Sequence, residues 1–347
     1  MLSFITQQRL HNQLLTQHPF KKIEDVVRHM GAVQAQDYPA AKWAIGVRMN
    51  GITDADVEKA INDGKILRTH VMRPTWHLVA PEDLGWMQKL TGARVKRILK
   101  YYDERQDVNG AAVAKAEKII TKALRGTSLT KKELGEKLKS AGFKLKLNQL
   151  AHYVMHAELD GTICSGPRNS KIVTYALTEE RIKKEKQLDR DESIAELTKR
   201  YFTSHGPALL QDFNWWSGLP MGDIRRGVQL IGNRLQSETI GKKTFYFYDI
   251  APKVKNISNT AFLLPNYDEY GVAYRHREEM LHPGDLKTIV FSNPIFAGGQ
   301  LVGAWKKTQR ASGVKIDTKF IHPVTPIQKT NLNKEITRLR KFWYPEK

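Results

Sequence analysis

Cysteine is almost absent from this sequence, since Cys164 is the only one among 347 residues. A single cysteine cannot form a disulfide within the chain, and it excludes zinc fingers built on cysteine ligands. No run approaches the roughly 18 apolar residues of a membrane span. The first residues also lack the apolar segment and small-residue cleavage site of a secretory signal. We therefore expect a protein of the reducing cytoplasm with no membrane association.

Acidic residues are scarce relative to basic ones. The sequence has 36 Asp and Glu against 56 Lys and Arg, which gives a formal net charge of +20 and a pI of about 9.8. A protein this basic usually meets a polyanion, either nucleic acid or an acidic membrane. A lysine-rich surface that serves solubility alone is the alternative. With 41% hydrophobic residues the chain should fold, and its length favours two to four domains.

The common catalytic signatures are missing as well. The sequence has no Walker loop, no HExxH, no G-x-S-x-G and no dinucleotide fingerprint. His152 and His156 stand at i and i+4 on a predicted helix, followed by Glu158. That spacing could hold a metal ion, but no clear third ligand accompanies it. We expect neither a metal nor another cofactor.

The hydrophobic pattern predicts three blocks of similar plan, each with helices followed by a β-hairpin. In the first block, the helical spacing is followed by an alternating stretch over 65–80 that bends at 72–74, and then by a long helix over 81–105. Its predicted helices span 5–15, 22–33, 37–47 and 53–62. Helices followed by a β-ribbon form the winged-helix plan.

The same plan recurs over 128–180 and 192–250, without sequence identity between the blocks. The pattern changes after Pro252: residues 260–330 carry short strands with Gly and Pro turns, and a last helix is expected over 331–341. The predicted domains are three winged-helix units and a β-barrel-like unit, over 1–110, 111–188, 189–255 and 256–347.

The hairpin over 65–80 and the long helix after it carry candidate DNA contacts. A charged hairpin on a winged helix suits contact with a groove or with phosphates, although it could equally be a solvated surface hairpin. The candidate DNA-binding residues are Arg68, His70, Arg73, Thr75, His77, Arg94 and Arg97.

Two aromatic stretches have less specific interpretations. HGPALLQDFNWWSG (205–218) carries two tryptophans, whose more natural use is packing of the third block. YDEYGVAYRHRE (267–278) mixes carboxylates, tyrosines and arginines. It could be a site, but a tyrosine-rich turn that closes a domain interface explains it at least as well.

Gln34 and Gln36 stand one residue apart in a small, apolar stretch, between two predicted helices. Each buried amide needs hydrogen-bond partners, so a pair of them is costly without a purpose. Residues i and i+2 point to opposite sides of a helix but to the same side of extended chain. At a helix junction, both amides could therefore aim at one point. The alternative is that they cap the adjoining helix ends.

Five stretches in this order carry a resemblance to a known family: VQAQDYPAAKWAIGVR, RTHVMRPTWHLVAPED, RYFTSHGPALLQDFNWWSGL, FLLPNYDEYGVAYRHRE and GGQLVGAW. Together they resemble the winged-helix DNA glycosylases typified by AlkZ and YcaQ, over nearly the whole chain. The resemblance implies an α+β fold of three tandem winged-helix domains and a C-terminal β-barrel, C-shaped around duplex DNA. It also implies that Gln34 and Gln36 form the catalytic Gln-x-Gln signature of the AlkZ branch. The YcaQ-like branch has a Gln-x-Asp signature instead; the nearby aspartate of this sequence, Asp37, lies one position beyond the place that this signature requires.

Glutamine has no useful pKa, so a glutamine pair suits a substrate that needs no acid catalyst. N7-alkylguanine and N3-alkyladenine already carry positive charge, and their glycosidic bonds break without protonation. Two amide carbonyls could then position the attacking water. We expect a monomeric, monofunctional glycosylase that acts on double-stranded DNA and associates with the nucleoid. The alternative is a non-enzymatic winged-helix DNA-binding protein or transcription regulator.

Overall fold

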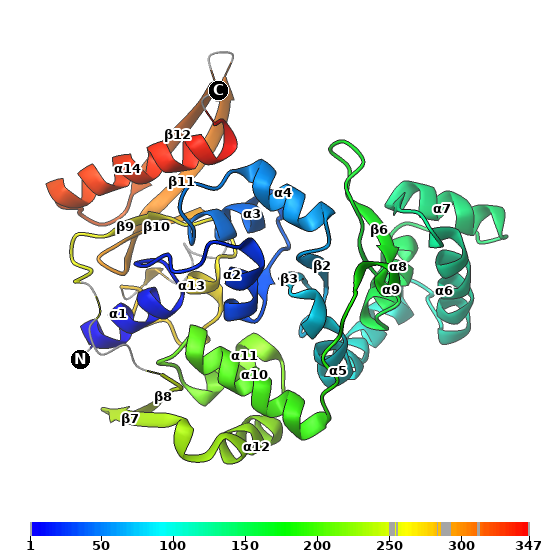
Figure 1. Ribbon diagram of the computed structural model, residues 1–347, viewed down its shortest axis with the longest axis horizontal. Coiled ribbons are helices and arrows are strands. Elements are labelled where there is room, and N and C mark those ends of the chain that lie inside the picture. Colours follow the sequence, from blue (N-terminus) through cyan, green and yellow to red (C-terminus); the bar gives the residue numbers. More distant parts are fainter. Residues whose placement is uncertain are drawn as a thin grey trace.

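The computed structural model describes residues 2–249, 254, 256–282, 284–285, 293–310 and 313–345. Within this part of the chain, three units share one order of elements and a fourth unit follows (Figure 1). Each of the three consists of a helix, a short extended segment, two more helices and an antiparallel hairpin. The short segment pairs with the last strand of the hairpin in every case, which is the winged-helix topology.

The first unit follows the N-terminal helix α1 (Leu2–Asn12) and holds a three-stranded sheet of order β1-β3-β2. The side chain of Asp37 caps one of its helices by accepting from Ala40 N, and Thr53 forms a capping box with Asp56 at the next. Its elements are α2 (Ile23–Met30), β1 (Val33–Gln34), α3 (Tyr38–Gly46), α4 (Asp54–Asn62), β2 (Leu67–His70) and β3 (Trp76–Val79).

A 3₁₀ turn η1 (Pro81–Asp83) and the long helix α5 (Leu84–Arg105) lead into the second unit. Its sheet has the order β4-β6-β5, and a capping box between Thr130 and Glu133 starts its second helix. Its elements are α6 (Gly110–Leu124), β4 (Leu129–Thr130), α7 (Lys131–Ser140), α8 (Gln149–Leu159), β5 (Ile163–Ser165) and β6 (Thr174–Leu177).

The third unit follows the short helix α9 (Thr178–Arg181). A single bridge between Ala208 and Tyr246 takes the place of its first strand. Its elements are α10 (Arg190–Ser204), α11 (Leu210–Ser217), α12 (Met221–Ile231), η2 (Gly232–Arg234), β7 (Gln236–Ile240) and β8 (Lys243–Phe247).

The C-terminal unit is a curled, half-barrel sheet of order β12-β11-β10-β9 with the last helix beside it (Figure 1). A bulge between Ile295 and Phe296 interrupts the register of β10 with β11. Its elements are β9 (Ala261–Leu263), α13 (Glu269–Val272), β10 (Asn293–Ala297), β11 (Gln300–Arg310), β12 (Gly313–Phe320) and α14 (Pro326–Trp343).

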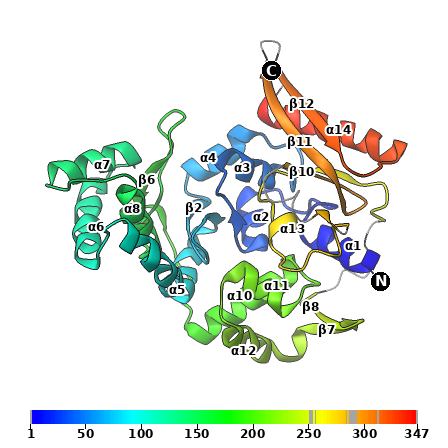
Figure 2. The same ribbon diagram turned by 180° about the vertical axis from the view of Figure 1, so that it is seen from behind.

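The hydrophobic core does not follow the order of the units. One cluster joins the first, third and C-terminal units, and it includes Trp43, Trp86, Tyr201, Trp216 and Phe296. The second unit has a core of its own, around side chains such as those of Ile120 and Leu134. Figures 1 and 2 show this unit standing to one side at the end of α5, which gives the molecule a curved, open outline.

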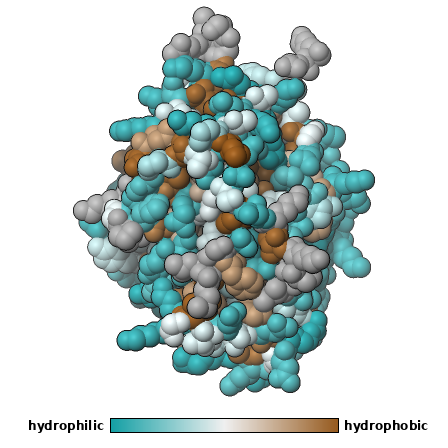
Figure 3. All heavy atoms as spheres, turned by 90° about the vertical axis from the view of Figure 1, so that its left-hand side faces the viewer, coloured by the Kyte–Doolittle hydropathy of each residue, from teal (hydrophilic) through white to brown (hydrophobic). Residues whose placement is uncertain are grey.

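The surface contains no membrane-spanning element in the part of the chain that the structure describes: none of these helices is both long and apolar enough to cross a bilayer. The face over α1, β7 and the start of α14 is mostly hydrophilic, with apolar residues scattered among the polar ones (Figure 3). Isolated exposed apolar side chains of this kind are ordinary on a folded protein.

The fold class predicted from the sequence is confirmed, with four differences in detail. The helix predicted over 22–33 ends at Met30, and the short strand β1 follows it. Helix α6 was not expected, and β11 and β12 are long rather than short. Helix α14 begins at Pro326 instead of residue 331, because Thr325 and Gln328 form a capping box there. The domain boundaries stay predictions, and residues 252 and 255 lie outside the described residues.

Candidate active site

The two glutamines lie at different depths at the end of β1. Gln34 is the last residue of the strand and is 9% exposed, whereas Gln36 is exposed and directly precedes Asp37, the N-cap of α3. Gln34 lies in a short strand between two helices, and the chain bends at Gln36 and Asp37 before α3 begins. Sheet pairing therefore fixes the backbone of Gln34, and the cap of α3 fixes the end of the segment that carries Gln36.

His77 of β3 is the cross-strand partner of Gln34. Ala35 N donates to Trp76 O at 2.7 Å, one position along each strand, so Gln34 and His77 form a non-hydrogen-bonded pair. In such pairs the Cα atoms lie about 4.5 Å apart and the side chains are neighbours on one face. His77 is fully buried, and this burial, with the charge of Arg73 nearby, lowers its pKa to about 3. The imidazole beside Gln34 is therefore neutral at physiological pH.

The other edge of β1 meets a carboxylate from the C-terminal unit. Gln34 N donates to Glu269 Oε1 at 2.7 Å, and Trp216 Nε1 donates to Glu269 Oε2 at 2.9 Å. His205 Nε2 lies 3.5 Å from the same oxygen, Oε2. Burial alone raises the pKa of Glu269, but the interaction with His205 and the nearby positive charge of Arg73 lower it to about 2. Glu269 is thus a buried, ionised acceptor at the edge of the strand.

The turn of the β2–β3 hairpin closes this cluster on the side of the third unit. Met72 has a positive φ of 64°, and its carbonyl oxygen lies so close to Gly218 that a Cβ there would approach it to 2.9 Å. The next residue, Arg73, is buried enough that desolvation lowers its pKa. Several buried polar atoms in this region have no hydrogen-bond partner among the described residues: Gln34 Oε1, Arg73 Nε and Nη2, Thr75 Oγ1 and His77 Nε2.

Among the described residues, this arrangement offers uncharged polar atoms beside Gln34, and neither Glu269 nor His77 is in the state of a general acid. An amide carbonyl and a neutral imidazole nitrogen can orient a small polar molecule such as water. A general acid must be protonated at the working pH, whereas Glu269 is ionised and His77 is neutral. The geometry therefore suits chemistry in which the leaving group needs no acid.

Comparison with known proteins identifies the family. The model of the AlkZ-like DNA glycosylases matches residues 27–342. The chain belongs to this family. It is 21% identical over 327 residues to an interstrand DNA cross-link repair glycosylase of Streptomyces sahachiroi, covering 86% of this chain and 85% of that one. The solved structure of Streptomyces sahachiroi DNA glycosylase AlkZ superposes with a TM-score of 0.80 at 18% identity, covering 98% and 96% of the two chains. That likeness shows a shared fold, and the resemblance stated from the sequence is confirmed.

Three of the predicted DNA contacts lie inside this AlkZ-like glycosylase rather than on an exposed wing. Arg68 is 8% exposed, His70 1% and His77 0%. Arg68 Nε donates to Ala35 O at 3.0 Å, and its guanidinium lies over the ring of Trp76. The expectation of an exposed, charged hairpin was wrong, because the second unit packs against β2 and Gly218 of the third unit lies against the hairpin turn.

The contacts of the hairpin show how it is covered. Arg68 N donates to Ser165 Oγ of β5 at 2.9 Å, and His70 Nδ1 lies 2.6 Å from Glu158 Oε2 of α8. Both partners belong to the second unit. Arg68 in turn donates to the carbonyl of Ala35, the residue between the two glutamines, and so helps to fix the backbone of this segment.

Arg94 and Arg97 are exposed, as expected for residues that contact DNA. With Arg190 they line a pocket between α5 and the start of α12, in which Asp223 provides an acidic group. Thr75 is half-buried in the hairpin turn. DNA contact by any of the seven residues stays a prediction.

The two helical histidines have a structural explanation. Asp103 of α5 lies 2.6 Å from His152 Nδ1 through Oδ1 and 2.8 Å from His156 Nε2 through Oδ2. One carboxylate thus fixes α8 against α5, which accounts for the i, i+4 spacing. Among the described residues, no group of three or more His, Cys, Asp or Glu side chains could hold a metal ion.

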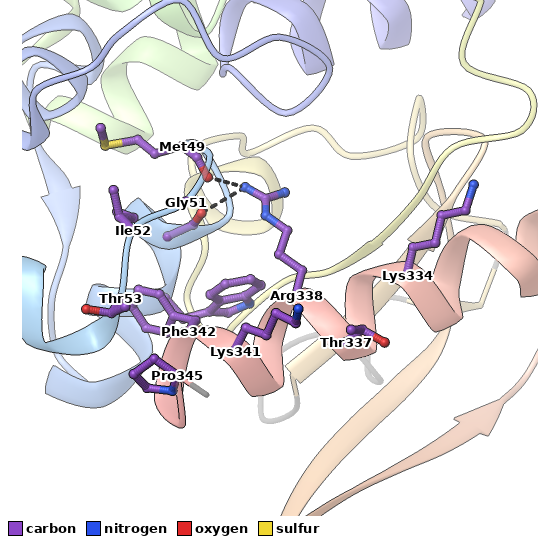
Figure 4. Close-up of a pocket in the computed structure, with 12 residues that line it drawn as sticks. Met49, Gly51, Ile52, Thr53, Lys334, Thr337, Arg338, Lys341, Phe342 and Pro345 are labelled. Carbon is purple, nitrogen blue, oxygen red and sulfur yellow. Dashed lines mark hydrogen bonds between the residues drawn. The ribbon is translucent and has the colours of Figure 1, made fainter. Parts of the chain in front are cut away.

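A separate pocket lies between the α3–α4 connection and α14 (Figure 4). Arg338 Nη2 enters it and donates to the carbonyls of Gly46 at 2.9 Å, Val47 at 3.0 Å and Met49 at 2.5 Å. These carbonyls lie at the end of α3 and just beyond it, so the arginine caps that helix. Neither Gln34 nor Gln36 lines the pocket.

Sequence reasoning missed Glu269, His205 and Trp216 as members of the site. All three belong to the two aromatic stretches described from the sequence, 205–218 and 267–278. Nothing in either stretch indicates that it meets β1, because the partners are as much as 235 residues apart.

Proposed function

We propose that this AlkZ-like glycosylase hydrolyses the N-glycosidic bond of cationic alkylated purines in duplex DNA, with N7-alkylguanine as the principal substrate. The observation that carries this proposal is the protonation state of the groups next to Gln34. The pKa of Glu269 is held at about 2 and that of His77 at about 3, so neither can protonate a leaving base near neutral pH. A base that is already positively charged needs no such proton.

Gln34 and Gln36 are the catalytic residues in this proposal. Their amide carbonyls orient a water toward C1′ of the nucleotide and stabilise the positive charge that the water acquires as it attacks. Gln34 is buried and Gln36 is exposed, so in this proposal Gln34 acts from inside the protein and Gln36 faces the DNA. The enzyme acts as a monomer in this proposal.

Interstrand crosslinks are a second substrate of the same chemistry. A crosslink joined through N7 of two guanines carries the same activated glycosidic bonds as the monoadduct. The relative from Streptomyces sahachiroi is named a cross-link repair glycosylase, which supports testing this substrate together with the monoadduct. The net charge of +20 supports binding to the phosphate backbone over an extended duplex.

The test is single-turnover excision from a duplex that carries 7-methylguanine and from a duplex with an N7-linked crosslink, each followed by cleavage at abasic sites. We expect Gln34→Ala and Gln36→Ala each to lower the rate by roughly 10² to 10³, the loss seen when one positioned catalytic dipole is removed. The duplex dissociation constant should stay nearly unchanged, because these interactions act in the transition state. The two losses should not add fully, since both amides serve one water.

Two further variants sharpen the test. Gln236→Ala removes an exposed glutamine from β7, in the third unit, and should excise at the wild-type rate. Gln36→Glu places a base where the amide was and should keep more activity than Gln36→Ala. Tight duplex binding by the wild type without any base release would instead identify a non-enzymatic DNA-binding protein. Wild-type rates in both alanine variants would remove Gln34 and Gln36 from the mechanism.

A further inference from the structure

The outer edge of β1 presents a structural problem that one side chain solves. β1 is only two residues long and lies at the edge of its sheet, with β3 on its inner side. An edge strand leaves its outward N–H groups without a strand partner, and a buried N–H without an acceptor is costly. At Gln34 the acceptor is Glu269 Oε1, at 2.7 Å. A charged acceptor at this distance forms one of the stronger hydrogen bonds found in proteins.

We propose that Glu269 is a positioning residue for the glycosylase reaction, holding the backbone of Gln34 so that its side chain meets the attacking water. This inference rests on the proposed function, because it concerns the residue to which that function assigns catalysis. Glu269 is fully buried and its carboxylate reaches β1 from α13 of the C-terminal unit. It acts on the reaction only through Gln34.

The carboxylate is itself fixed from two directions. Trp216 of α11 donates to Oε2 at 2.9 Å, which leaves Oε1 directed at Gln34 N. The preceding residue, Asp268, caps α13 by accepting from Tyr270 N at 3.0 Å and receives two hydrogen bonds from Arg48 of the first unit. Three units therefore meet at this carboxylate, and the strand that carries Gln34 is held between β3 and a rigid acceptor.

A positioning role predicts a specific pattern of loss. Glu269→Ala removes the acceptor, so Gln34 should move relative to the bound nucleotide while the DNA-binding surface stays intact. We expect the single-turnover excision rate to fall at least tenfold, since small displacements of a catalytic group have large effects on rate. The dissociation constant for the same lesion duplex should stay within about twofold of the wild type.

The conservative variant Glu269→Gln distinguishes a role in positioning Gln34 from a role in folding alone. Glu269→Gln keeps an oxygen for Gln34 N but turns an NH₂ group toward the Trp216 N–H, so two donors face each other. Glu269→Gln combined with Trp216→Phe removes that conflict and should excise faster than Glu269→Gln alone. A merely structural role would not produce this recovery, because the double variant lacks more native hydrogen bonds than the single one.

Tyr270→Phe is the matched control. It lies on the same short helix, is equally buried, and loses the hydrogen bond from its hydroxyl to Gly299 O at 2.9 Å. We expect excision within about twofold of the wild type. Hydrogen exchange of the peptide that contains β1 provides a readout independent of activity. It should quicken in Glu269→Ala and stay at the wild-type rate in Tyr270→Phe.

The outcomes are distinguishable. Slower excision with retained binding and faster exchange at β1 supports the inference. Wild-type excision per folded molecule in Glu269→Ala and in Glu269→Gln overturns it and leaves the proposed function standing, as does an equal loss in Tyr270→Phe. A wild-type enzyme that releases no base from either lesion overturns the proposed function and, with it, the role given to Glu269.

Discussion

The buried pair of Arg48 and Asp268 gives the sharpest prediction about stability. Both side chains have zero exposure, and the guanidinium donates to Asp268 Oδ2 at 2.7 Å and to Oδ1 at 2.9 Å. Its remaining donors reach Gln13 O at 2.9 Å, Ala44 O at 2.8 Å and Gln13 Oε1 at 3.3 Å. An arginine has five N–H donors, so every donor of Arg48 is used.

Removing one partner leaves an unpaired charge in the core. Arg48→Met deprives the Asp268 carboxylate of both charged hydrogen bonds and leaves it, among the described residues, the hydrogen bond from Tyr270 N. Breaking a buried pair in this way costs about 3–5 kcal/mol of unfolding free energy. Asp268→Asn should cost a similar amount while preserving the cap of α13, because asparagine caps helices as well as aspartate does. The double variant should be less destabilised than the sum of the two by on the order of 2 kcal/mol, since no lone charge remains.

Urea unfolding followed by tryptophan fluorescence measures these changes in the units that contain Arg48 and Asp268. The seven tryptophans lie at positions 43, 76, 86, 215, 216, 305 and 343, so none falls within the second unit. The signal therefore reports the core shared by the other three units. Losses below about 1 kcal/mol in both single variants, a range typical of exposed ion pairs, would refute the reasoning, as would fully additive losses in the double variant.

Three more predictions concern binding, pH and the reaction type. Arg94→Ala and Arg97→Ala should weaken duplex binding and each lower the salt slope of log K by up to about 1 in titrations at several ionic strengths; an unchanged slope would exclude phosphate contacts there. Because burial lowers the pKa of His77 to about 3, the folded state disfavours its protonation. Keeping His77 neutral therefore contributes on the order of a few kcal/mol to the free energy of unfolding. This contribution should be complete above about pH 6.5 and lost as the pH falls toward 3. His77→Gln should flatten that decline in unfolding titrations. Borohydride should trap no covalent complex, because the lysine nearest to the glutamines on their C-terminal side, Lys42, is paired with Asp54 at 2.6 Å and Glu58 at 2.9 Å; a trapped adduct would indicate a bifunctional enzyme.

Local signals in the sequence predict most of the helices. Asp37, Thr53 and Thr130 are of residue types that favour the N-cap position, and each caps a helix in the structure. The same rules overlook β1, because a strand of two residues has no periodicity of its own and exists only through pairing with β3. They also place the buried hairpin on the surface, because a charged side chain usually indicates exposure. Arg68 is an exception since a carbonyl and an aromatic ring replace its water.

Only the segment that carries Gln34 and Gln36 could be predicted from the sequence as part of the candidate site. The Gln34 and Gln36 pattern and the family resemblance indicate the catalytic strand, and this assignment stays a prediction. The surroundings of Gln34 depend on chain segments brought together by tertiary packing, and no local rule pairs Glu269 with a backbone N–H in the first unit. Without an observable partner, Glu269 is only one carboxylate in a tyrosine-rich turn.

The shared core has a consequence for how the protein is made. Gln34 and Glu269 are separated by 235 positions, and chains grow at roughly 5–20 residues per second. The acceptor for the Gln34 N–H therefore leaves the ribosome about 10 to 50 s after the strand it completes. During that interval the second unit, with its own core, can fold, while the first unit still lacks partners that are encoded further downstream. A nascent chain that is interrupted before α13 would carry both glutamines yet lack the edge that holds them.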